Sequence, residues 1–192
     1  MSLAEKIVGR MTSGAEVGRD ELEIITYGLN SLLAKGVNFL LPLPIILFLG
    51  LGKEYLVLWI ILSFLRPRAG GYHARTQLRC LIFSTVLLLA STAGVRVWEY
   101  GYRGGRKELL ILILFMELAI SLAAPVDTEN KRLTKEEKGT QKKRVIGFLM
   151  VLNLFLAISY YWEFMMNFYV VIQVLLCQLI LLAGGIVKNK GK

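Results

Sequence analysis

The chain has 192 residues, of which 55% are hydrophobic, and it carries a formal charge of +9. The hydrophobic residues are gathered in long blocks such as LPLPIILFLGLG and VVIQVLLCQLILLAGGIV, which have almost no polar positions. A soluble domain of this length needs polar faces on its helices, so the composition predicts an integral membrane protein. The basic residues lie between the blocks, without interleaved aromatics on one surface, which argues against a nucleic-acid-binding protein.

The first 23 residues are charged throughout and lack the continuous apolar core of a cleavable signal peptide. Ser2 and Glu5 have the spacing of a capping box, and apolar residues follow at helical spacing. Residues 1–23 are therefore predicted to be an amphipathic region whose helix lies at the membrane interface. Asp20, with Glu23 three residues later, indicates the start of a second helix, which is predicted to enter the bilayer and to be kinked at Pro42 and Pro44.

Five further apolar stretches lie at about 54–65, 81–98, 109–124, 145–162 and 164–187. The first of these five is shorter than the roughly 20 residues of a straight membrane span, which predicts a short or half-length helix. The predicted fold is an all-α integral membrane protein, with about six membrane segments after an N-terminal amphipathic helix. A single domain over residues 1–192 is expected.

The lysines and arginines indicate the orientation of the chain in the cell membrane. When all six segments cross and the N-terminus is cytoplasmic, most of these residues fall in the inner regions 1–23, 66–79, 125–144 and the tail after Val187. The positive-inside rule therefore predicts a multi-pass protein with both termini in the cytoplasm. Residues 125–144 are predicted to form a basic cytoplasmic loop with some helix.

The stretch GGYHARTQLRC, residues 70–80, contains the only histidine of the chain, His73, and one of its two cysteines, Cys80. On a straight helix, residues seven apart are separated by about 10.5 Å along the axis, so their contact requires a bend in the backbone. Gly70 and Gly71 permit such a bend. Thr76 is a good N-cap, which predicts a helix from about Gln77 with Cys80 in its first turn.

A thiol at that position has its thiolate form favoured by the helix N-terminus, by an adjacent imidazolium and by nearby arginines. His73 is then suited to protonate a leaving amine, and the Gly70 and Gly71 amides to bind an oxyanion. The spacing alone favours another interpretation, in which the histidine is an interfacial residue and the cysteine a small hydrophobic residue or a palmitoylation site.

The longer pattern LRPRAGGYHARTQLRC, with Arg66, Gly70, Gly71, His73 and Cys80, resembles the accessory gene regulator B (AgrB) family. Its members are membrane-embedded cysteine endopeptidases of Gram-positive quorum sensing. The resemblance extends to the chain's size, the N-terminal amphipathic region followed by YGL, the several membrane segments, and an AP dipeptide that leads to a basic loop.

The resemblance implies that Cys80 is the nucleophile and His73 its acid–base partner, with Arg66, Gly70 and Gly71 shaping the site within a catalytic region at 66–80. The implied substrate is an AgrD-like precursor peptide whose C-terminal tail is cleaved through an acyl-thioester, with cyclisation to a thiolactone or lactone autoinducer. Neither a metal nor another cofactor is implied, and the site is expected at the cytoplasmic side. A peptide exporter and a non-enzymatic membrane scaffold are the alternatives, and a homodimer is compatible with the polar residues of the last segment.

Several polar residues lie inside the apolar stretches. Glu117 is near the middle of one of them, where its expected role is to orient His73, to bind substrate or to pair with a buried donor. The default role of the amides is hydrogen bonding between helices, and this applies to Asn153, Asn167, Gln173 and Gln178. Cys177, which lies in a purely apolar setting, is expected to be unreactive.

Overall fold

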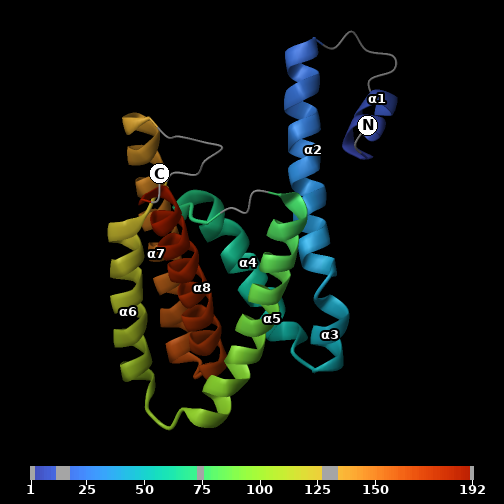
Figure 1. Ribbon diagram of the computed structural model, residues 1–192. Helices are drawn as coiled ribbons and strands as arrows, with labels where there is room; N and C mark the ends of the chain where they lie inside the picture. The colour runs from blue at the N-terminus through green and yellow to red at the C-terminus, as the bar shows by residue number, and fades with distance from the viewer. Residues whose placement is uncertain (1–2, 12–17, 73–75, 127–133, 191–192) are drawn as a thin grey trace. The chain divides into compact units, whose positions relative to one another are not determined.

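The computed structural model describes residues 3–11, 18–72, 76–126 and 134–190, and this part of the chain forms eight α-helices (Figure 1). The contacts divide the chain into two compact units, Met1–Pro44 and Ile45–Lys192. The prediction of an all-α protein is confirmed for these residues.

The first unit contains α1 (Leu3–Met11) and α2 (Arg19–Leu40), which pack against each other. Val8 of α1 is buried, so the predicted amphipathic helix forms and buries part of its apolar face. The predicted capping residue Ser2 lies outside the described residues. The N-cap of α2 is Gly18, so this helix begins slightly earlier than Asp20 predicts. Asp20 lies instead in the first turn, where its charge is favourable to the helix dipole.

The two prolines break the helix where a kink was predicted. After α2 ends at Leu40, residues 41 and 42 form a turn, and the short helix α3 (Leu43–Phe48) follows. Pro42 has no N–H with which to continue the hydrogen bonding of α2. Pro44 occupies the first turn of α3, where the missing N–H has no helical acceptor and costs nothing.

Besides the end of α3, the second unit contains five helices, one for each of the five later apolar stretches. They are α4 (Gly52–Ala69), α5 (Gln77–Gly101), α6 (Arg106–Ala123), α7 (Lys135–Tyr161) and α8 (Met165–Lys190). α4 has 18 residues and is therefore about 27 Å long, which is longer than the apolar stretch 54–65 and slightly shorter than a straight span of roughly 20 residues. The charged residues at both ends of α4 are also helical, so the helix is longer than its apolar stretch.

Four helical segments are long and apolar enough to cross a membrane: Asp20–Phe48, Leu78–Gly101, Lys135–Tyr161 and Met165–Lys188. α4 and α6 are not among them, because each carries four charged residues in 18. Length and composition therefore confirm four of the roughly six predicted membrane segments.

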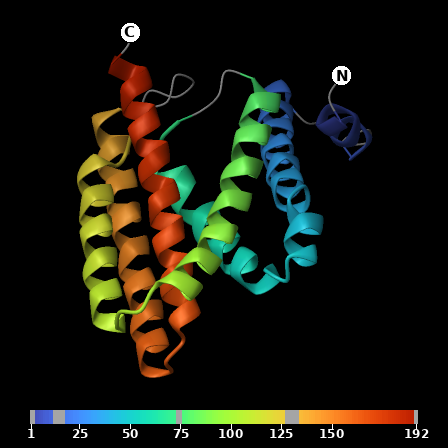
Figure 2. The ribbon, with the colours of Figure 1, turned by 60° about the horizontal axis from the view of Figure 1, so that its bottom comes forward.

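α8 is the centre of the second unit and contacts α4, α5, α6 and α7. Figures 1 and 2 show it between the α6–α7 pair on one side and α4 with α5 on the other. Its residues 168, 170–172, 174 and 175 are completely buried. A helix that is apolar all round is stable only when it is surrounded in this way, and α8 thereby becomes the support on which the other helices are placed.

Polar side chains link the helices of this unit, as predicted for the amides. Asn153 of α7 donates a hydrogen bond from Nδ2 to Oε2 of Glu117 on α6, at 2.7 Å. Glu117 is only 6% exposed, and its pairing with a donor on a neighbouring helix is one of the three roles considered for it. Cys177 of α8 lies 2.6 Å from the Ser91 hydroxyl of α5, in the buried core.

Candidate active site

α4 ends at two glycines whose backbone only glycine adopts readily. The Gly70 N–H donates to the carbonyl of Arg66 at 3.1 Å, which closes the last turn of α4. Gly70 then has φ +73° and Gly71 has φ +127°, both in the region that L side chains rarely adopt. The chain reverses direction here before α5 begins, so the predicted bend at this pair is confirmed (Figure 1).

The Gly70–Gly71 bend is held against two other segments of the second unit. The Val126 N–H donates to the carbonyl of Ala69 at 3.1 Å, and Gly70 and Val126 form an isolated parallel β-bridge. On the opposite side, the Tyr72 N–H donates to the carbonyl of Leu181 in α8 at 2.8 Å. The bend is therefore fixed by main-chain hydrogen bonds and not by its own sequence alone.

α8 receives the bend on one helical face, formed by Gln178, Leu181 and Gly185. These residues have the i, i+3, i+7 spacing of a single face. Gln178 donates a hydrogen bond from Nε2 to the carbonyl of Gly70 at 3.0 Å. A side chain at Gly185 would begin 2.9 Å from the carbonyl carbon of Gly71, so this close approach of α8 to the bend requires glycine at position 185.

Cys80 lies in the first turn of α5, as predicted. Thr76 is the N-cap, and its Oγ1 accepts a hydrogen bond from the Arg79 N–H at 3.3 Å. The Cys80 N–H donates to the carbonyl of Thr76 at 3.0 Å, which places the cysteine in the last position of that turn. The side chain of Cys80 is partly exposed, and that of Cys177 is buried.

Tyr72 connects the bend to α5. Its ring meets the Phe83 ring edge to face, with centroids 5.4 Å apart, and Lys188 of α8 lies over it at 5.4 Å. The chain is thus fixed at Tyr72 on one side and at the Thr76 cap on the other. His73 lies between them, outside the described residues, so its contact with Cys80 stays a prediction.

Arg66 reaches across to α5 near the cysteine. Its Nη1 donates to Oγ of Ser84 at 3.1 Å. Ser84 is four residues after Cys80, on the same face of α5 and about 6 Å further along the axis. The guanidinium therefore places a positive charge one turn from the thiol. Arg68 instead bonds to the Phe64 carbonyl of its own helix and lies over the Phe64 ring.

The structure thus brings Arg66, Gly70, Gly71 and Cys80 to the same end of the second unit. Sequence reasoning missed the supporting residues Ser84, Val126 and Leu181, and it assigned Gln178 to helix pairing only. The one available signal was the Gly184–Gly185 pair inside α8, because adjacent small residues in a membrane helix mark a close approach of another backbone.

The described fold and site define a class: an all-helical membrane protein with a partly exposed cysteine at a helix start, behind a glycine bend. A sequence profile of the family described as accessory gene regulator B matches residues 4–182. The chain therefore belongs to the accessory gene regulator B family, which serves accessory gene regulator quorum sensing, and it is a multi-pass membrane protein.

Individual relatives agree with this assignment. AgrB-like protein 2 of Clostridium perfringens strain 13 is 24% identical over 82% of this chain and 74% of its own length. An AgrB-like protein of Clostridium perfringens strain SM101 is 25% identical over the same shares of both chains. FsrB of Enterococcus faecalis is 40% identical over a shorter region, which is 28% of this chain and 22% of that protein. No solved structure gives a significant match.

Proposed function

We propose that this chain is a membrane-embedded cysteine endopeptidase that removes the C-terminal tail of a quorum-sensing precursor peptide and closes the remainder into a ring. The observation that carries the proposal is the position of Cys80. It lies in the first turn of α5, one turn before Ser84, which accepts a hydrogen bond from Arg66, and at the same end of the second unit as the Gly70–Gly71 bend. The helix N-terminus and the guanidinium both favour the thiolate, which is the nucleophilic form.

In the first step, the thiolate of Cys80 attacks the carbonyl carbon of the scissile peptide bond. The carbon–nitrogen bond breaks, the leaving amine takes a proton from the imidazolium of His73, and the acyl group remains on the sulfur as a thioester. In the second step, a thiol of the same peptide loses its proton to His73 and attacks this thioester. The Cys80 thiolate leaves, and a thiolactone is released. A serine hydroxyl in place of the thiol yields a lactone.

The membrane setting suits this chemistry because neither step consumes water. Hydrolysis of the acyl-thioester is the competing reaction, and it is suppressed where water is scarce and the attacking thiol is held close. The bend is packed against α8 and Val126, so the site is bordered by buried apolar residues, which include Leu65, Ala69 and Leu181.

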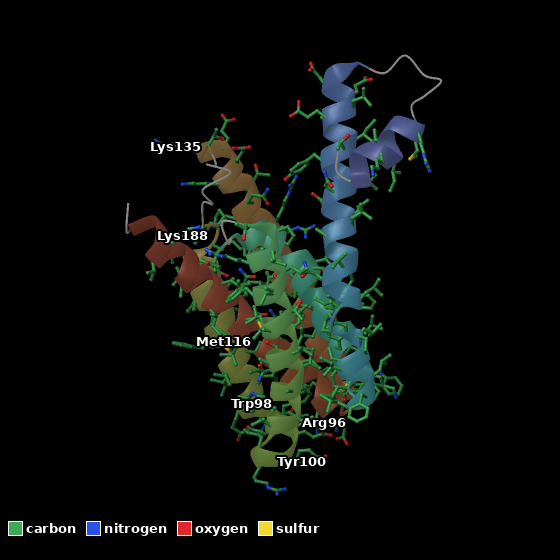
Figure 3. All side chains as sticks on the ribbon, turned by 45° about the vertical axis from the view of Figure 1, so that its right-hand side comes forward. Arg96, Trp98, Tyr100, Met116, Lys135 and Lys188 are labelled. Carbon is green, nitrogen blue, oxygen red and sulfur yellow. The ribbon has the colours of Figure 1, made fainter. Side chains whose placement is uncertain are left out.

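The distribution of charge supports a cytoplasmic site. In the second unit, basic residues collect at the end that carries the bend; they are Arg66, Arg68, Arg79, Lys135, Lys138, Lys142, Lys143, Arg144 and Lys188. Figure 3 shows Lys135 and Lys188 at this end, and Arg96, Trp98 and Tyr100 at the other. At that other end, two arginines are neutralised by ion pairs, Arg96 with Glu99 at 2.6 Å and Arg106 with Glu163 at 2.9 Å. The positive-inside rule then assigns the Cys80 end, and with it the C-terminal end of α8, to the cytoplasm.

The test uses the purified full chain in liposomes with a synthetic precursor peptide that has an amphipathic helix, an internal cysteine and a charged tail. Mass spectrometry should find the released tail and a second product that is lighter by one water than the hydrolysed peptide. Cys80→Ala and His73→Ala should each abolish both products. Cys177→Ser is the matched control, because it changes the other cysteine, keeps a hydrogen-bonding group next to Ser91, and should leave the products unchanged.

Two results would contradict the proposal. Full activity of Cys80→Ser would exclude thiolate catalysis, since a serine without its own activated base is a far weaker nucleophile. Transport of an intact peptide across the bilayer, without cleavage, would favour the exporter.

A further inference from the structure

Gln178 is a fully buried amide in an apolar helix. It has no exposed surface, and it lies on α8 among residues that are almost all aliphatic. Burying a polar side chain in such a place costs solvation free energy, unless a hydrogen bond offsets that cost. Its Nε2 makes one such bond, to the carbonyl of Gly70. Its Oε1 is buried and accepts no hydrogen bond from the residues that the structure describes.

The partner of Gln178 is not a side chain of a neighbouring helix but the backbone at the end of α4. The Gly70 N–H closes the last turn of α4. The Gly70 carbonyl belongs to the next peptide group, and its orientation sets the direction in which the chain leaves the helix. Gly71 and Tyr72 follow directly, and they are held by the next turn of the same α8 face, at Leu181. Gln178 therefore acts on the first peptide group of the segment that leads to Cys80.

We propose that Gln178 is a positioning residue of the Cys80 site, which fixes the exit of the chain from α4 through its hydrogen bond to Gly70. The inference rests on the proposed function and deepens it, since the residue touches neither the sulfur nor the scissile bond. Without this bond, Gly70 and Gly71 have wide conformational freedom, and the bend samples conformations that do not present the segment to the thiol. Binding of the precursor's remote parts does not depend on this bond.

The expected effect follows from that division of roles. Gln178→Leu keeps a side chain of similar volume and removes its donor, so the turnover number kcat should fall about tenfold while KM stays within about twofold. The alkylation rate of Cys80 by iodoacetamide, measured on the unloaded protein, should also change. The midpoint of thermal unfolding should change little, because the variant buries an aliphatic side chain in an aliphatic environment.

Gln173→Leu is the matched control on the same helix. Gln173 is half-buried and lies against Gly94 of α5, where a methyl group added to the glycine would be 2.5 Å from its Nε2. Gly94 is 14 residues after Cys80, about 21 Å along the helix. This variant removes the same amide from the same helix and should leave kcat and the alkylation rate of Cys80 unchanged.

The two readouts separate this inference from the proposed function. If the wild-type chain cleaves the precursor and Gln178→Leu matches it in kcat and in alkylation rate, the positioning role is wrong and the peptidase assignment stands. If no cleavage is found but Gln178→Leu alone alters the alkylation of Cys80, the positioning role stands and the peptidase assignment fails. Equal effects of Gln178→Leu and Gln173→Leu would overturn the inference, because the effect would then belong to α8 as a whole.

Discussion

Gly71→Ala tests whether the docked bend depends on a residue without a side chain. At φ +127°, alanine is strained by about 1–3 kcal/mol. Its methyl group would begin 2.8 Å from the Leu181 carbonyl oxygen, in a helix that is packed on all sides and cannot withdraw. Such an overpacked contact costs a further 1–3 kcal/mol or so, and the total is roughly 2–6 kcal/mol.

The lower end of that range already undocks the bend in a measurable fraction of molecules. A change of about 2 kcal/mol lowers the ratio of docked to undocked bend about 30-fold. The Tyr72 N–H, which bonds to Leu181 when the bend is docked, reports this directly. Hydrogen exchange followed by mass spectrometry on a peptide that contains Tyr72 should show protection reduced at least 30-fold, and cleavage of the precursor should fall in parallel.

The matched control is Gly147→Ala in α7, where an added methyl group meets no atom within 4 Å. Alanine is the better helix former, so this variant should be neutral or more stable by up to about 1 kcal/mol, with unchanged exchange at Tyr72. Wild-type protection in Gly71→Ala would refute the reasoning, since it would mean that neither the strain nor the contact with Leu181 exists.

Three further predictions concern the surroundings of the site. Arg66→Leu should slow alkylation of Cys80 about tenfold, because it removes the charge held one turn away by Ser84, whereas Arg68→Leu should not; equal rates in the two variants would contradict the assigned role of Arg66. Thr76→Ala should lower the free energy of unfolding by about 1 kcal/mol in thermal denaturation through loss of the α5 cap, and Thr76→Ser should restore it; a failure of serine to rescue would exclude capping as the cause. Glu117→Leu should lower the free energy of unfolding by about 1 kcal/mol in a titration with dodecyl sulfate, because Asn153 loses its hydrogen-bond acceptor. Glu117→Gln keeps an acceptor and should match the wild type.

The local part of the site could be predicted from the sequence because local chemistry decides it. Thr76 caps α5 through a bond to a residue three positions away, and Gly70 and Gly71 permit the positive φ values of the reversal after α4. The break at Pro42 and the helical nature of the later apolar stretches follow from the same short-range rules. The apolar composition likewise determined that the chain is a helical membrane protein.

Only the tertiary structure decided what supports the bend. Val126 is more than 50 residues from Gly70 along the chain, and Gln178 and Leu181 are more than 100 away, so no local pattern relates them. Their contacts are backbone approaches and carbonyl hydrogen bonds, which leave little trace in residue type beyond a pair of glycines in α8. The sequence thus predicted which groups carry the proposed chemistry. Their placement depended on how α4, α5, α6 and α7 pack around α8, because packing joins residues that the chain keeps far apart.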